Sequence, residues 1–357
     1  MAYYFLLQVG MSFIFFLTFD KNIELNFKKF IHFFFLIFLI IFTGLRYEVG
    51  GDWFIYNENF ILNSTKFNFY DLSIRSDYGW ELISFILSKL NFSYVSINLI
   101  SSLFFFISLS VFTKEYNYKL LVFIVSFPIV ILILLMGFTR QAVAFSFLLL
   151  SLNYLFKEKF LKSFIFILLG VFFHKSVILF LFLYLLFPTK LFKYLINNLF
   201  LLIFIFTLIL ITVYGLYNDF FQIYTQYFGR NISSNPESKG TYFRWLINFI
   251  PSIIFIFLHK KFNLNYIQKR VYLSFSFLII LSFFFINSFS TGIDRYLYYF
   301  TIIQIFVFSN LPNLRIKLKK HLIIGIILYH LLILYVWLMY SVHSYLWIPY
   351  KIYYFNI

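Results

Sequence analysis

The sequence predicts an all-α, polytopic integral membrane protein, and three observations carry that prediction. Hydrophobic residues make up 62% of the 357 residues and charged residues only 12%, whereas soluble domains carry roughly a quarter of charged residues. Runs of about 20 apolar residues, the length that spans a bilayer as a helix, recur along the chain. The sequence has no ten-residue segments that alternate apolar and polar residues, as transmembrane barrels do, and helices satisfy their own backbone hydrogen bonds in hydrocarbon.

About twelve transmembrane helices are expected, in a single domain that covers residues 1–357. Two gaps between the apolar runs are long, and we expect 46–94 to form a large extracytoplasmic segment and 218–240 a second outer loop. The first apolar run lacks a basic leader and a cleavage motif, so we expect it to remain as a helix. The expected spans are 3–19, 30–45, 95–113, 120–138, 141–156, 160–173, 176–189, 195–217, 241–258, 271–287, 296–311 and 322–340.

The net charge of +16 comes mostly from short loops between apolar runs, which is how a membrane protein orients itself rather than how it binds nucleic acid. Six such loops are basic, and all six are cytoplasmic only if the chain crosses the membrane twice between Lys162 and Lys190. The polar cluster in that stretch is Phe173-His174-Lys175-Ser176, so the reversal is predicted there. Each half has about 14 residues, or roughly 21 Å of helix, which is short of a core of about 30 Å. The turn is therefore expected to be recessed.

This topology puts several charged motifs on the extracytoplasmic side, where charges near the membrane are usually functional. In Arg46-Tyr47-Glu48-Val49-Gly50-Gly51-Asp52-Trp53, the paired glycines permit a close backbone approach to a ligand, and Arg46 could grip a phosphate. The same arginine could instead anchor a helix at the interface. Arg140 and Gln141 follow a junction of two apolar runs, where Arg140 could reach a cavity or simply snorkel to water.

Further candidates lie later in the chain. His174 could move protons near neutral pH, beside the cation of Lys175, or it could be a packed residue. Asp294 and Arg295 could serve a site, or they could pair with each other or with other loop charges, and Arg244 and Arg230 are similar cases.

Some functions are excluded by what the sequence lacks. It has no cysteine, no Walker motif, no HExxH, no DxD pair and no histidine cluster. These absences argue against an ATPase, a zinc protease and a metal-dependent nucleotide-sugar transferase. We therefore expect no metal and no cofactor, and a lipid-linked donor fits better than a nucleotide sugar.

Together these motifs resemble the EpsG-like branch of the Wzy polysaccharide polymerases, which act on O-antigens, capsules and exopolysaccharides. Their order and spacing match across roughly residues 40–300, with one departure: Gly51 stands where the family's Gly-Thr-Asp has threonine. The resemblance rests on Arg46-x-x-x-Gly50-Gly51-Asp52 with Tyr56, Tyr78-Gly79-Trp80-Glu81, Arg140-Gln141-x-x-Ala144, Phe173-His174-Lys175-Ser176 and Asp294-Arg295.

The resemblance implies a glycosyltransferase that moves a growing glycan from undecaprenyl diphosphate to an incoming lipid-linked unit. Arginines would take the charge of the leaving diphosphate, and either His174 or Asp52 would be the base. The expected catalytic residues are Arg46, Asp52, Arg140, His174 and Arg295. The expected substrate-binding residues are Tyr56, Glu81, Gln141, Lys175, Arg230, Arg244 and Asp294.

The same resemblance implies a multi-pass protein of the bacterial inner membrane. Its partners would be the undecaprenyl-diphosphate-linked oligosaccharide, the lipid bilayer, and the flippase and chain-length regulator of the same pathway, with no nucleic acid. Two alternatives stay open: a flippase or other transporter of lipid-linked oligosaccharides, and a membrane O-acyltransferase that acts on polysaccharide.

Overall fold

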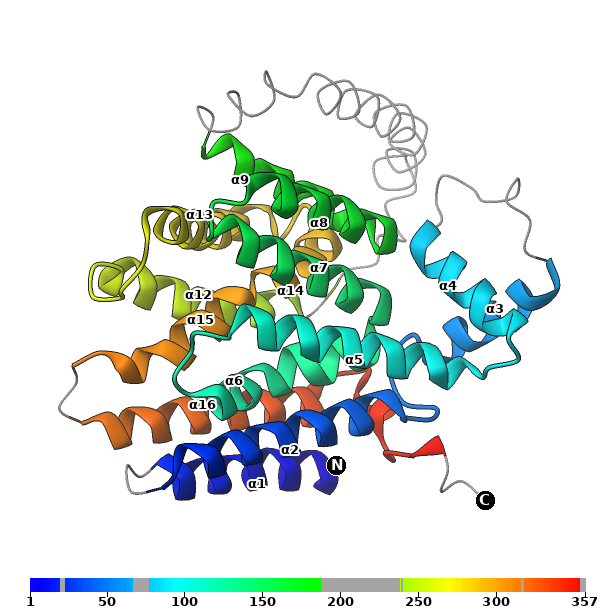
Figure 1. Ribbon diagram of the computed structural model, residues 1–357, viewed down its shortest axis with the longest axis horizontal. Coiled ribbons are helices and arrows are strands. Elements are labelled where there is room, and N and C mark those ends of the chain that lie inside the picture. The colour runs from blue at the N-terminus through cyan, green and yellow to red at the C-terminus, as the bar shows by residue number, and fades with distance from the viewer. Residues whose placement is uncertain (20–22, 67–76, 188–237, 239, 316–317, 354–357) are drawn as a thin grey trace.

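The computed structural model confirms the all-α class within the part of the chain that it describes. There the backbone is helical apart from turns and isolated bridge pairing, such as that between Arg46 and Ile352 (Figure 1). The predicted span 195–217 lies outside the described residues, as does nearly all of the predicted loop 218–240. The described residues are 1–19, 23–66, 77–187, 238, 240–315 and 318–353.

Most helices run side by side along one direction and form a bundle (Figure 1). The sequence predicted one span over 296–311, but the structure has two helices there, α14 and α15, which are separated by Thr301. The bundle elements are α1 (Ala2–Phe19), α2 (Leu25–Gly44), α5 (Tyr94–Phe112), α6 (Lys119–Ser126) with the π-helical η2 (Phe127–Leu135), α7 (Thr139–Leu155), α8 (Phe160–Phe173), η3 (Lys175–Leu181) with α9 (Phe182–Leu185), α12 (Thr241–Leu258), α13 (Tyr266–Ser282), α14 (Ser290–Phe300), α15 (Ile302–Asn310) and α16 (Lys319–Tyr340).

Six helices of the described chain are long and apolar enough to cross a membrane, so the protein is a helical membrane protein. They are α1, α2, α5, α12, Tyr266–Phe285 and α16. Three shorter apolar helical segments, Lys119–Leu135, Phe160–Phe173 and Lys175–Leu185, fall below that length. The expected count of twelve spans is therefore not supported by the described part of the chain.

The predicted reversal at His174 is present. α8 ends at Phe173, His174 has extended backbone angles, and η3 begins at Lys175. The segments on either side of the reversal, α8 and η3 with α9, pack against each other. A hydrogen bond of 2.8 Å from the Tyr184 hydroxyl to Ser163 Oγ joins them. Gly170 allows this close packing, since a Cβ there would lie 3.2 Å from Val177 Cγ1.

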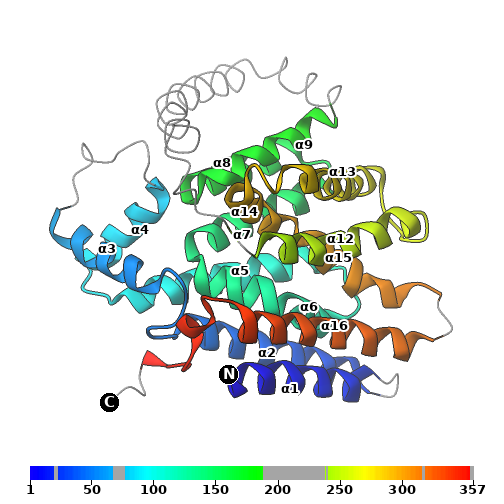
Figure 2. The same cartoon turned by 180° about the vertical axis from the view of Figure 1, so that it is seen from behind.

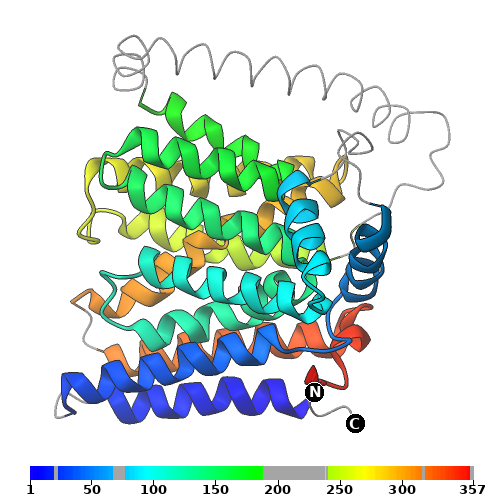
Figure 3. The same cartoon turned by 45° about the vertical axis from the view of Figure 1, so that its right-hand side comes forward.

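The segment 46–94 is more ordered than the sequence predicted, because it holds two helices. They are α3 (Trp53–Lys66) and α4 (Tyr78–Lys89), and they lie at one end of the bundle (Figure 3). An aromatic cluster joins them to α5, through Trp53, Tyr56, Phe60, Trp80 and Tyr94. The segment therefore forms a structured cap on that end.

The basic loops that the structure describes gather at the opposite end of the bundle. Lys319 Nζ lies 5.7 Å from the Phe19 ring centroid and 5.1 Å from that of Tyr118. These contacts bring together the three loops next to Phe19, Tyr118 and Lys319. Asn265 Nδ2 donates to Phe156 O at 2.9 Å and joins two more. The bundle therefore has a basic end and an end capped by α3 and α4, which we call the capped end.

Candidate functional site

Arg46 begins the turn that leads from α2 into α3, and its side chain is enclosed rather than open toward a phosphate. The residue is only 1% exposed. Its guanidinium donates to Val49 O at 3.2 Å, to Asn98 Oδ1 and Thr139 Oγ1 at 2.9 Å each, and to Thr43 O. A side chain enclosed in this way has no donor open to a ligand, so it holds α2, α5 and α7 together.

The turn that Arg46 supports delivers Asp52 to the capped end. Gly50 has φ +121°, and a Cβ there would lie 2.0 Å from Met136 O, so the turn requires glycine at this position. The Asp52 amide then donates to Gly137 O at 3.2 Å, which fixes the turn to the start of α7. Asp52 is partly exposed, and its Oδ2 accepts a 2.8 Å hydrogen bond from the Tyr56 hydroxyl.

Arg140 joins this turn to α4. Its Nε donates to the Tyr56 hydroxyl at 3.0 Å, and its Nη1 forms a 3.0 Å ion pair with Asp77 Oδ2. The Arg140 side chain remains 35% exposed, whereas that of Asp77 is 10% exposed. Arg140 is thus held by Tyr56 and Asp77 and still has a face open toward a ligand.

The two carboxylates of this network have shifted proton affinities. Burial raises the pKa of Asp77, although the charges of Arg140 and Lys175 oppose that rise. Burial likewise raises the pKa of Asp52, against the hydrogen bond from Tyr56 and the charges of Arg140 and Arg295. Each carboxylate therefore depends on nearby cations to remain ionised.

His174 lies at the turn between α8 and η3, and it faces the same group of charges. Its Nδ1 is hydrogen-bonded to Ser176 Oγ at 2.5 Å, and Ser176 Oγ to the Tyr299 hydroxyl at 2.8 Å. Burial, followed by the charges of Arg140, Arg295 and Lys175, lowers the pKa of His174 to about 3. The imidazole is therefore neutral near pH 7. Within the described chain its Nε2 has no hydrogen-bond partner.

Arg295 is the exposed cation of the group. Gln141 Nε2 donates to its backbone oxygen at 2.7 Å, which fixes α14 against α7. Its guanidinium makes no hydrogen bond or ion pair to another described residue, yet its charge acts on Asp52, Asp77 and His174. Because its guanidinium has no partner among the described residues, Arg295 can bind an added anion.

Arg244 and Asp294 form a neighbouring ion pair between α12 and α14. The Arg244 Nη2 also donates to Ser238 Oγ at 2.9 Å, and its guanidinium lies 5.5 Å from the Tyr298 ring centroid. The ion pair with Asp294 balances the charge of Arg244 and joins α12 to α14, the helix that carries Arg295. Of the other expected residues, Lys175 is partly exposed next to His174, and Glu81 is partly exposed on α4. Arg230 lies outside the described residues.

Three residues of this site were not among the candidates chosen from the sequence: Asp77, Ser176 and Tyr299. Asp77 stands just before α4 in a polar stretch, where its acidity alone did not distinguish it. Ser176 was in the motif of His174, and its spacing of two residues could have suggested the hydrogen bond. Tyr299 had no such signal, because its partners come from distant segments.

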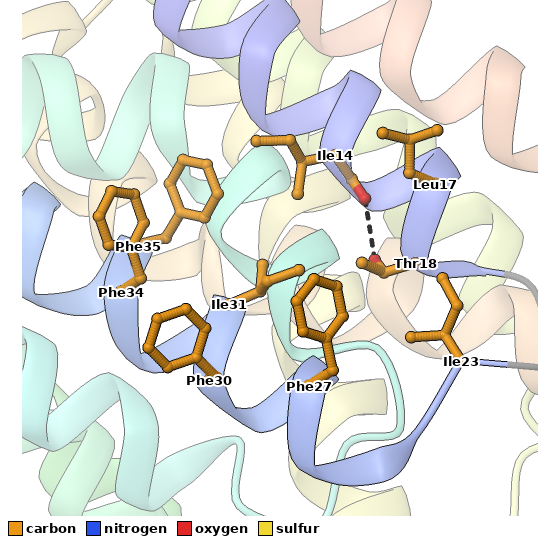
Figure 4. A pocket seen from close by; sticks show the side chains of 9 residues that line it. All are labelled: Ile14, Leu17, Thr18, Ile23, Phe27, Phe30, Ile31, Phe34 and Phe35. Atoms are coloured by element: carbon orange, nitrogen blue, oxygen red, sulfur yellow. Dashed lines mark hydrogen bonds between the residues drawn. The ribbon is translucent and has the colours of Figure 1, made fainter.

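An apolar groove of about 390 Å³ lies elsewhere, between α1 and α2 near the basic end (Figure 4). Its lining is hydrocarbon apart from Thr18, whose hydroxyl donates to Ile14 O at 2.9 Å. Such a surface offers nothing for acid–base chemistry. No group of three His, Asp or Glu side chains that could hold a metal occurs among the described residues.

The fold and the capped end together define a helical membrane protein with a site of arginines, carboxylates and a neutral histidine. The chain belongs to the EpsG family, whose sequence profile matches residues 28–352, nearly its whole length. The match shows a membrane protein of polysaccharide biosynthesis. No curated protein and no solved structure matches the chain.

Proposed function

We propose that this chain is a polysaccharide polymerase that transfers a growing glycan from undecaprenyl diphosphate to a hydroxyl of an incoming lipid-linked repeat unit. The observation that supports this most is the guanidinium of Arg295, unpaired among the described residues, beside the anchored Arg140, two carboxylates and a neutral imidazole. A diphosphate leaving group needs cations, and an acceptor hydroxyl needs a proton acceptor. The site offers both at one end of an apolar bundle.

The diphosphate would bind to Arg295 and to the open face of Arg140. Arginine suits this task because its planar fork can donate two hydrogen bonds to phosphate oxygens. Arg140 is already oriented by Tyr56 and Asp77, so little reorganisation accompanies binding. Both guanidiniums would stabilise the charge that develops as the bond between the anomeric carbon and the diphosphate breaks.

The acceptor hydroxyl would lose its proton to Nε2 of His174 as its oxygen bonds to the anomeric carbon. Ser176 and Tyr299 fix the ring through Nδ1, which leaves Nε2 for the substrate. Burial lowers the pKa of His174 most, and nearby positive charges lower it further. The bound diphosphate would offset those charges, so the base would strengthen when the donor is in place. Asp52 is the second candidate for the base, since its carboxylate lies in the same network.

The orientation that suits this reaction places the basic end in the cytoplasm, following the excess of Lys and Arg there. The capped end would then face the extracytoplasmic side of a bacterial inner membrane. Lipid-linked units delivered by a flippase would reach the site within the outer leaflet, and a chain-length regulator of the same pathway would be a further partner.

The test is elongation by purified protein in proteoliposomes supplied with purified lipid-linked repeat units. We expect lengthened glycan, and we expect Arg295→Ala to lower turnover by about 10²-fold, the usual loss when one such donor is removed. Arg315→Ala is the matched control, because Arg315 is also an exposed arginine but lies at the basic end. Lipid moved across the bilayer without elongation, or sugar acylated instead, would replace the proposal with a flippase or an acyltransferase.

A further inference from the structure

The C-terminal segment, residues 341–353, returns to the capped end and lies against the turn that carries Asp52 (Figure 2). Three backbone hydrogen bonds of 3.0 Å join the two: Gly50 N to Leu346 O, Tyr47 N to Lys351 O and Tyr353 N to Leu45 O. Lys351 Nζ also pairs with Glu48 Oε2 at 2.5 Å. The segment therefore follows the whole turn, from the end of α2 to Gly50.

Trp347 is the anchor of this segment. The residue is 2% exposed, and its indole Nε1 donates to Leu132 O at 2.9 Å, while its backbone oxygen accepts from the Tyr4 hydroxyl at 2.7 Å. The Trp337 ring packs edge-on against it, with centroids 4.7 Å apart. The indole is therefore held by one hydrogen bond and a neighbouring ring, and the backbone of the residue is held by a second hydrogen bond.

The six-membered ring of that indole lies against two glycines. A Cβ on Gly137 would lie 2.6 Å from Trp347 Cζ2 and 2.9 Å from Cη2, which no side chain permits. A Cβ on Gly51 would lie 3.4 Å from Cη2, an ordinary contact. Gly51 and Gly137 are in turn the residues beside the hydrogen bond from Asp52 N to Gly137 O. The indole thus supports the junction between the turn and the start of α7.

We propose that Trp347 is a positioning residue whose indole sets the distance between Asp52 on the turn and Arg140 on α7. It acts through Gly51 and Gly137, against which its ring lies. The roles of Asp52 and Arg140 in catalysis rest on the proposed function, whereas the placement of the turn does not.

The test is a pair of compensating substitutions. Gly137→Ala should push the indole and the turn apart and lower kcat by about 10²-fold, the order expected for a misplacement near 1 Å, with KM changed by less than about threefold. Trp347→Phe removes the atoms that the new methyl would meet, so Gly137→Ala with Trp347→Phe should recover at least about tenfold of that loss. Gly325→Ala is the control, since a Cβ on Gly325 meets nothing within 4 Å.

A second readout is independent of activity. The chain has no cysteine, so Asp52→Cys gives one thiol whose rate of modification reports the position of the turn. Gly137→Ala should change that rate severalfold, and adding Trp347→Phe should restore it. Full activity in Gly137→Ala, or no recovery of either readout in the double variant, would overturn the role of Trp347. If the unaltered protein made no polymer, the proposed function would fall, and the thiol rates alone would decide whether Trp347 positions the turn.

Discussion

Arg46→Met tests whether Arg46 is a buried structural residue or a ligand-binding one. Methionine keeps much of the length and apolar volume of the arginine stem but removes all its donors. Five acceptors would lose a partner: Thr43 O, Val49 O, Asn98 Oδ1, Leu135 O and Thr139 Oγ1. Those groups come from α2, the turn, α5, η2 and α7, so the loss loosens the junction of all five.

The magnitude follows from burial. A buried acceptor left without a partner costs about 1–3 kcal/mol. The five acceptors would relax in part, so we expect a loss of about 3–5 kcal/mol in the free energy of unfolding, a large share of the roughly 5–15 kcal/mol that proteins have. Arg46→Lys should lose less, because an ammonium retains three donors but lacks the planar fork.

The assay is thermal unfolding of purified protein in detergent, together with turnover per folded molecule. Arg46→Met should lower Tm clearly and Arg315→Met should not, since Arg315 is exposed. Relative to the unaltered protein, Arg46→Met should lose more in the yield of folded protein than in turnover per folded molecule. A variant with unchanged Tm and no turnover would refute the structural role and return Arg46 to the catalytic residues.

Three further predictions concern the turn and the charged network. Gly50→Ala should lower Tm markedly because of its positive φ and the contact with Met136 O, whereas Gly51→Ala should keep nearly the normal Tm; equal Tm values would contradict this. Asp77→Asn removes the charge that holds Arg140, so turnover should fall by at least about tenfold with binding less affected, and unchanged turnover would show that the pair is dispensable. His174 has a lower pKa in the folded state, about 3 against 6.5, so the unfolded state binds more protons between those values. Stability should therefore rise with pH across that window, and His174→Gln should flatten the rise in unfolding measurements.

The sequence predicted the arrangement along the bundle well, because that arrangement depends on local properties. The reversal at His174 followed from the number of basic loops and the length of the apolar run, and both are read without knowing any tertiary contact. The helices α3 and α4 were not predicted, because short helices at the end of a bundle need no long apolar run. The predicted total of twelve spans is not supported, because six helices of the described chain are long and apolar enough to cross a membrane.

The candidate site was predicted as a set of segments rather than as a set of contacts. The motifs of Asp52, Arg140, His174 and Arg295 do meet at one end, as the topology required. What the sequence could not show is which arginine is enclosed and which is free, because that depends on partners such as Asn98 that have no motif of their own. Trp347 was missed for the same reason, since its contacts reach back to Tyr4, at the other end of the chain.

The most direct test of the central claim is to count undecaprenyl diphosphate released and glycosidic bonds formed by purified protein in proteoliposomes. Transfer from a lipid diphosphate at the capped end predicts one diphosphate lipid released for each bond formed. It also predicts that Arg295→Ala lowers both rates together, while Arg315→Ala lowers neither. Glycan growth without equal release of the diphosphate lipid, or growth that Arg295→Ala leaves unchanged, would contradict the account.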